Sequence, residues 1–201
     1  MEETVKTVLG ELEEWGLAND ARESERSKRM LNLEPDTAQL IGILIRSGAY
    51  KQLLEIGTSN GYSTIWLAWA ARETGGRVTS IEQNPAKLEL AEANLKRAGL
   101  REFVELHQGD ATQIISELTG PFDLVFFDAH RESYPVQLAL VLPRLTQRAL
   151  LLADNVHSHP DEIAGYLEAM SARQDEFDHV VVGVGKGLSV AYRQARTISS
   201  V

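Results

Sequence analysis

The sequence contains no cysteine, and this absence narrows the chemistry open to the protein. Without cysteine there is no disulfide bond, no thiolate nucleophile and no Cys-ligated zinc, so a metal ion would need oxygen or imidazole ligands. Basic residues are also few: 20 lysines and arginines stand against 29 acidic residues, which gives a formal net charge of -9 at pH 7. Because this charge repels a phosphate backbone, nucleic acid is disfavoured as a partner but not excluded.

Long apolar segments are absent as well. No run approaches the roughly 20 apolar residues needed to span a bilayer, and the first segment, MEETVKTVLGELEEW, is acidic where a secretory signal peptide would be basic. We therefore expect a cytoplasmic protein without a membrane partner. A length of 201 residues suits one buried core, so we expect a single domain, 1–201, with a helical N-terminal cap (1–48) and an α/β core (49–193).

Two hydrophobic patterns divide the chain. Apolar residues recur at helical spacing from Val5 to Trp15 and from Pro35 to Ile45. After that, short β-rich runs such as QLLEIG, RVTSIE and DLVFFDA alternate with longer helical ones. This alternation is typical of βαβ units and predicts an α/β fold with a parallel sheet covered by helices on both faces. Near the end, HVVVGVGKGLSVAYR predicts a β-hairpin at the sheet edge that turns around Gly185–Gly187.

Acidic residues end several of the predicted strands, at the edge of the sheet where ligands bind in open α/β folds. Gly57 and Gly61 bracket a turn that lets the backbone approach a ligand. Glu82 ends the next strand, where a carboxylate can accept hydrogen bonds from both ribose hydroxyls, and Asp110 follows the third, within reach of an adenine amine. Together they predict a nucleoside-containing cofactor, although each acid alone would equally suit a helix cap.

Two further strand ends carry oxygen ligands. Asp128 ends the fourth strand, and Asp154 with Asn155 ends the fifth, its neighbour in a doubly wound sheet. Two carboxylates and an amide oxygen suit a hard cation such as Mg2+. Such a cation would lower the pKa of a bound hydroxyl and neutralise the resulting oxyanion. The alternative is that both acids only cap loops.

Four segments together resemble the cation-dependent O-methyltransferases of the catechol and caffeoyl-CoA type: LLEIGTSNGYSTIWLA, VTSIEQNP, FDLVFFDAHRESY and LLLADNV. The similarity runs from about Pro35 to Arg193. It implies the Rossmann-like fold of class I methyltransferases, a seven-stranded, mostly parallel sheet with a C-terminal hairpin. It also implies S-adenosylmethionine as cofactor, an assisting divalent cation, a small hydroxylated acceptor as partner, and a homodimer.

The resemblance also implies roles for individual residues. Those expected around the cofactor are Glu55, Gly57, Thr58, Ser59, Gly61, Ser63, Glu82, Gln83, Asp110, Ala111, Asp128 and His130. The expected metal ligands are Asp128, Asp154 and Asn155, and the expected catalytic residues are Asp128 and Arg131. Arg131 stands where the family has a lysine thought to act as a general base. Because arginine stays protonated in proteins, it can stabilise an oxyanion but not accept the proton, so we expect the metal to promote deprotonation.

The sequence is also compatible with other functions. Related bacterial enzymes methylate hydroxyuridine in tRNA, and a chain with this cofactor site could bind S-adenosylmethionine without catalysis. The metal trio argues against a mere binding module, since cofactor binding alone needs no cation. A nicotinamide-dependent dehydrogenase is disfavoured, because the turn reads G-x-x-x-G and not G-x-G-x-x-G.

Overall fold

The structure is a computed structural model that describes residues 1–195. Its α-helices are α1 (Glu3–Arg22), α2 (Pro35–Gly48), α3 (Tyr62–Thr74), α4 (Pro85–Arg97), α5 (Ala111–Glu117), α6 (Tyr134–Val141) and α7 (Pro160–Ser171). Its strands are β1 (Gln52–Ile56), β2 (Arg77–Glu82), β3 (Val104–Gln108), β4 (Phe122–Phe127), β5 (Leu145–Ala153), β6 (Phe177–Val182) and β7 (Leu188–Arg193). Short 3-10 turns are η1 (Arg26–Lys28), η2 (Arg101–Phe103), η3 (Arg131–Ser133) and η4 (Leu142–Arg144).

The strands form one seven-stranded sheet in the order β3-β2-β1-β4-β5-β7-β6. Strands β1 to β5 pair in parallel, whereas β7 runs antiparallel to both β5 and β6. The strand order reverses between β1 and β4, and this switch point opens a crevice at the carboxyl ends of the strands. The predicted Rossmann-like sheet with a C-terminal hairpin is confirmed.

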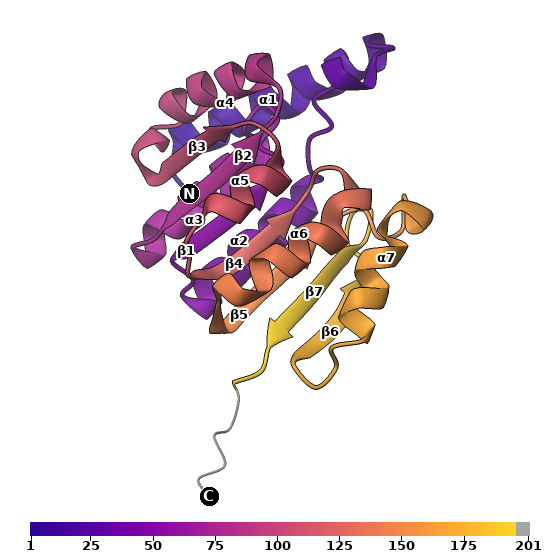
Figure 1. The fold of residues 1–201 in the computed structure, drawn as a ribbon. Coiled ribbons are helices and arrows are strands. Elements are labelled where there is room, and N and C mark those ends of the chain that lie inside the picture. Colours follow the sequence, from indigo (N-terminus) through magenta and orange to yellow (C-terminus); the bar gives the residue numbers. More distant parts are fainter. Residues whose placement is uncertain (196–201) are drawn as a thin grey trace, which may run out of the picture.

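Helices cover both faces of the sheet, as the continuous apolar runs of the strands predict. Along β4, Leu124 and Phe126 join the core under α1, α2 and α3, whereas Val125 and Phe127 join the core under α5, α6 and α7. Figure 1 shows α5 and α6 crossing in front of the sheet, with α7 next to β6 and β7. Successive residues of β4 therefore serve two cores, and this central strand has no solvated face.

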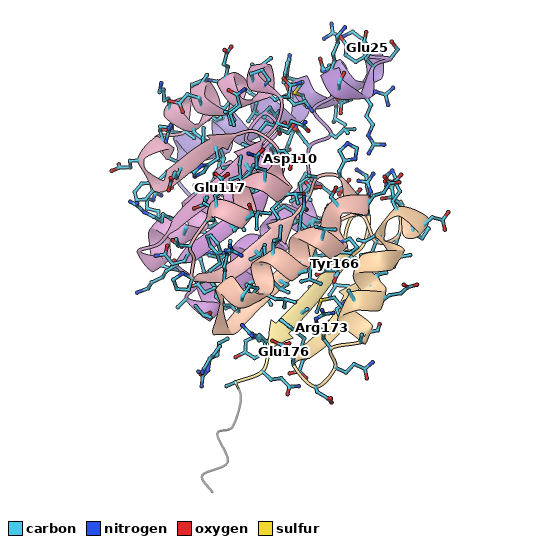
Figure 2. All side chains as sticks on the ribbon, in the orientation of Figure 1. Glu25, Asp110, Glu117, Tyr166, Arg173 and Glu176 are labelled. Atoms are coloured by element: carbon cyan, nitrogen blue, oxygen red, sulfur yellow. The ribbon has the colours of Figure 1, made fainter. Side chains whose placement is uncertain are left out.

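The N-terminal helices belong to the same core as the sheet. Val5, Leu9 and Leu12 of α1 and Ile41 of α2 are buried in the cluster that contains Leu53 of β1. Between the two helices, the chain projects from the body of the molecule, with Glu25 near its tip (Figure 2). This connection, residues 23–34, lies close to the carboxyl ends of the strands and becomes part of the site described below.

The C-terminal hairpin lies at the sheet edge, as predicted. Strand β6 is the outermost strand, and β7 lies between β5 and β6. Because β7 runs antiparallel to β5, with Ala153 opposite Ser189, the turn before β7 returns to the carboxyl end of β5. The turn is fixed there by two backbone hydrogen bonds, from Val156 N to Gly187 O (3.0 Å) and from His157 N to Lys186 O (2.8 Å). Within residues 1–195, no helix combines the length and apolar character that crossing a membrane would require.

The central position of β1 makes its core residues sensitive to truncation. Leu54 is completely buried, whereas Val180 on the edge strand β6 is 58% exposed. We predict that Leu54→Ala lowers the free energy of unfolding by about 2–5 kcal/mol, because it leaves a cavity in the core. The control Val180→Ala should stay within about 0.5 kcal/mol of wild type. Urea denaturation measures both, and equal losses would contradict this assignment of the core.

Candidate active site

The carboxyl ends of β1 to β5 open into one cleft of about 1020 Å³. Its wall includes most of the residues expected from the sequence: Gly57, Thr58, Ser59, Ser63, Glu82, Gln83, Asp110, Ala111, Asp128, His130, Arg131, Asp154 and Asn155. The order of these residues along the cleft follows the order of the strands: Asp110 after β3, Glu82 at the end of β2, Gly57 after β1, Asp128 after β4 and Asp154 after β5. The acidic residues at the strand ends therefore lie together in one cleft.

Two expected residues, Glu55 and Gly61, are not part of the wall. Gly61 is the N-cap of α3 with a φ of 88°, and a Cβ there would lie 3.1 Å from Ala91 of α4. Gly61 therefore serves the packing of α3 against α4. Gly57 is different: its φ is 110°, and a Cβ there would lie 2.2 Å from the carbonyl oxygen of Asp128. Only glycine lets the loops after β1 and β4 come this close.

Glu82 ties the loop after β1 to β2. Its carboxylate accepts hydrogen bonds from the backbone N–H groups of Ser59 (2.7 Å) and Asn84 (2.8 Å). Each carboxylate oxygen has a second lone pair, so the group can also accept hydrogen bonds from a ligand in the cleft. The hydroxyl of Ser59 donates to the carbonyl oxygen of Met30 (2.8 Å), which fastens the connection between α1 and α2 over the same loop.

Glu55 lies behind the wall as a buried carboxyl group. Ser63 donates to its Oε1 (2.6 Å), and Thr64 and Ser80 both donate to its Oε2 (2.5 Å each). Burial raises the pKa of Glu55 from 4.5 to about 7, and the hydroxyl donors partly oppose this shift. Since Ser63 lines the cleft, Glu55 orients a cleft residue and has no direct access to a ligand there.

The expected metal trio is assembled at the end of β4 and β5. Phe127 pairs with Ala153, so Asp128 and Asp154 follow on neighbouring strands. Asn155 Nδ2 donates to Asp128 Oδ1 (3.3 Å) and to Asp154 Oδ2 (2.8 Å). The other oxygen of Asp154 is buried without a hydrogen-bond partner. Burial, and next the neighbouring Asp154 carboxylate, raise the pKa of Asp128, and burial also raises that of Asp154.

Two neighbouring carboxylates, the partly buried Asp128 and the buried Asp154 with its unpaired oxygen, fit a divalent cation, because their mutual repulsion needs a compensating positive charge. Within residues 1–195, no group of three or more His, Asp or Glu side chains lies together in a way that would hold a metal. The Asn155 amide, which contacts both carboxylates, can supply a further oxygen ligand. Its Oδ1 now accepts a hydrogen bond from Ser158 Oγ (3.1 Å).

Arg131 is buried in the wall and is held from α7. Its Nε and Nη2 both contact Glu162 Oε2, at 2.8 and 2.7 Å. The side chain of Arg131 is only 5% exposed, so its charge is fixed beside the loop after β4. The same loop is positioned by Tyr134, whose buried hydroxyl oxygen accepts a hydrogen bond from Ala129 N (3.0 Å). Tyr134 packs against Phe127 and Tyr166, the latter shown on α7 in Figure 2.

Several wall residues were missed by sequence reasoning. Lys186, in the hairpin turn, forms an ion pair with Glu34 (2.6 Å), and its charge favours the ionised forms of Asp128 and Asp154. No local signal in the sequence places Lys186 at this edge, because it reaches the site only through the pairing of β7 with β5. Arg26 and Arg29 also line the cleft, whereas Lys28 pairs with Glu25 outside it.

Other missed wall residues have weaker signals. His159 is half-buried in the wall, while His157 is exposed. Gln137 of α6 also lines the cleft, although its position in an apolar helix gave no hint of a ligand-binding role.

Comparison with known proteins gives consistent results. A family model described as O-methyltransferase matches residues 9–192. A catechol O-methyltransferase from Niastella koreensis is 31% identical over 156 residues, 76% of this chain and 70% of that protein. A catechol O-methyltransferase from Mycobacterium tuberculosis is 36% identical over 140 residues, 69% of this chain and 61% of that protein. The match thus spans less than two thirds of the second relative.

Solved structures are similar over nearly the whole chain. The O-methyltransferase TomG from Streptomyces achromogenes, involved in tomaymycin synthesis and solved in complex with S-adenosylmethionine, superposes with a TM-score of 0.78 at 28% identity. The superposition covers 96% of this chain and 91% of that one. The similarity includes all the strands that supply the cleft.

The buried Glu55 predicts a specific pH dependence of stability. Its folded pKa of about 7 lies above the usual 4.5 of an exposed glutamate, so the folded state binds the extra proton between these pH values and loses stability as pH rises through them. Relative to Glu55→Gln, wild type should therefore lose about 3 kcal/mol of unfolding free energy between pH 4.5 and 8, since one pKa unit corresponds to about 1.4 kcal/mol. Denaturant titrations at several pH values measure the difference; a flat difference would contradict it.

Proposed function

Because this chain belongs to the O-methyltransferase family and is an S-adenosylmethionine-dependent enzyme of that family, we propose that it methylates a hydroxyl of a small, catechol-like acceptor with the help of a divalent cation. The observation that carries the proposal is the adjacent pair of the partly buried Asp128 and the buried Asp154 at one end of the cofactor cleft, with one Asp154 oxygen unpaired. A methyltransferase that used only its cofactor would have no need for two acids placed so close together.

The cofactor is proposed to lie along the strand ends in extended form. Gly57, Thr58, Ser59 and Ser63 surround its methionine part, and Glu82 with Gln83 holds the ribose. Asp110, labelled at the start of α5 in Figure 2, and the following residue Ala111 contact the adenine base. Asp128 and His130 complete the contacts at the sulfonium. We assign Glu55 a positioning role through Ser63, since three hydroxyl groups hold its carboxyl group away from the cleft.

The cation is proposed to bind Asp128, Asp154 and the Asn155 side chain. Bound there, it relieves the repulsion between the two carboxylates and gives the unpaired Asp154 oxygen a partner. The donor set consists only of oxygen atoms, which suits Mg2+ or a similar hard ion. The Asn155 amide would present its oxygen to the ion, in exchange for its present bonds to the two carboxylates.

The reaction places few demands on protein groups beyond position and charge. When bound, S-adenosylmethionine supplies the methyl group, which passes to the acceptor oxygen as its bond to sulfur breaks, and the cation supplies positive charge beside that oxygen. Residues of the cleft wall provide the position and the remaining charge. Asp128 lies between the cofactor and the acceptor, and the buried Arg131 and the hairpin residue Lys186 add fixed positive charge on the acceptor side.

The wider setting of the enzyme is also a proposal. Since α1 and α2 share a core with the sheet, we propose that residues 1–195 act as one domain that includes the N-terminal cap. A cytoplasmic location and a homodimer are proposed from the sequence and the family resemblance. The alternative methyl acceptor is tRNA. The net charge of -9 favours the small molecule, and transfer assays on bulk tRNA and on catechols distinguish the two.

The metal assignment predicts opposite effects of one substitution on stability and on metal binding. Asp154→Asn removes one of two repelling acids, so the metal-free variant should be at least as stable as wild type. It should nevertheless bind Mg2+ at least about 10-fold more weakly, while its affinity for S-adenosylhomocysteine stays within about 3-fold of wild type. Thermal unfolding and calorimetry measure these quantities. The control Asp161→Asn, exposed on α7, should resemble wild type; unchanged Mg2+ affinity in Asp154→Asn would contradict the assignment.

The role of Arg131 as a fixed charge predicts a change in the pH–rate profile. Lysine can lose its proton in the range where arginine cannot, so Arg131→Lys should add a new ionisation to the profile of kcat/KM between about pH 7 and 10. Arg173→Lys, in the turn that follows α7, should leave the profile unchanged. If Arg131→Lys adds no ionisation, residue 131 does not lie where the acceptor proton leaves.

A further inference from the structure

Gln137 of α6 is a buried side chain with an unused hydrogen-bond acceptor in the cleft wall. The residue is only 3% exposed, and it lines the cleft. Its Nε2 donates to Thr112 Oγ1 of α5 (3.4 Å), whereas its Oε1 is buried without any partner. Buried polar atoms in native proteins are nearly always paired, because an unpaired acceptor forfeits its hydrogen bond to water. The free oxygen of Gln137 therefore indicates a donor that belongs to a ligand.

The position of Gln137 identifies which part of the ligand it meets. Thr112, its partner, directly follows Asp110 and Ala111, the two residues after β3 that lie at the base end of the cleft. Helices α5 and α6 pack together, which places Gln137 beside Thr112 at this end of the cleft. The metal trio lies at the other end of the cleft, after β4 and β5. Gln137 thus belongs to the pocket for the base of the proposed nucleoside cofactor.

Adenine offers few donors to such an oxygen. Its ring nitrogens N1, N3 and N7 are acceptors, and its 6-amino group is the one donor on the edges of the base. Asp110 can serve one hydrogen of this amine, but its carboxylate is exposed and already caps α5 through Gln113 N (2.9 Å). An exposed acceptor that loses its ligand partner turns to water. A buried acceptor cannot hydrogen-bond to water when its ligand partner is missing, so it discriminates more strongly between bases.

We propose that Gln137 Oε1 accepts a hydrogen bond from the 6-amino group of the cofactor's adenine, which makes Gln137 a specificity-determining residue for the base. The inference rests on the proposed function, since it takes the cofactor to be an adenine nucleoside in this orientation. A base with hydrogen or a carbonyl oxygen at position 6 leaves Gln137 Oε1 unpaired or opposes it with a second acceptor. Thr112 positions the amide by holding its other end.

The test compares two ligands that differ only in the proposed donor. Calorimetry measures the dissociation constants of S-adenosylhomocysteine and of its analogue with hydrogen in place of the 6-amino group. Wild type should bind the amino compound at least about 10-fold more tightly, as expected for one buried hydrogen bond. In Gln137→Leu, affinity for S-adenosylhomocysteine should fall about 10-fold and affinity for the analogue should change less than about 3-fold, so the preference disappears.

Two further variants keep the test decisive. Gln137→Glu retains an acceptor at the same place and should keep the preference for the amino compound, even if Gln137→Leu folds poorly. Gln113→Leu alters an exposed glutamine on α5 outside the wall and should behave as wild type. A preference that survives intact in Gln137→Leu overturns the inference and leaves the proposed function standing. If wild type binds neither ligand, the proposed function itself fails.

Discussion

The close approach of two carboxylates, one buried and one partly buried, at the end of neighbouring parallel strands is the constraint on which the site depends. The register that pairs Phe127 with Ala153 brings Asp128 and Asp154 side by side, and burial raises the pKa of both. The protein tolerates this repulsion with a bridging amide from Asn155 and a nearby ammonium group from Lys186. Charge that is confined in this way is costly to leave uncompensated, and this cost is the reason for our proposal that a cation binds there.

The rest of the molecule can be understood as support for that arrangement. Gly57 lets the loops after β1 and β4 touch, and the aromatic group of Phe127, Tyr134 and Tyr166 fixes the loop that follows Asp128. On the opposite side, the hairpin turn and the connection between α1 and α2 meet through Lys186 and Glu34. These two segments, which are distant in sequence, therefore meet in the wall of the cleft.

Much of this was predictable from sequence because it depends on local signals. Hydrophobic periodicity predicts the alternation of strands and helices, and acids at strand ends predict a shared edge, since parallel strands end on one side. The exceptions depend on contacts between distant segments. Burial separates Glu55 from the cleft, and packing against Ala91 explains Gly61. Lys186 reaches the site only because β7 pairs with β5, and Gln137 only because α6 packs on α5; neither partner is encoded locally.

The most direct test of the account is methyl transfer from S-adenosylmethionine to a panel of catechols, measured with the wild-type protein before chelation, after exhaustive chelation and after Mg2+ is restored. The account predicts that transfer occurs, falls by at least about 100-fold without a divalent cation, and returns with Mg2+. Full methylating activity in the chelated protein would contradict it, because the adjacent carboxylates Asp128 and Asp154 would then serve some purpose other than holding a cation beside the reacting oxygen.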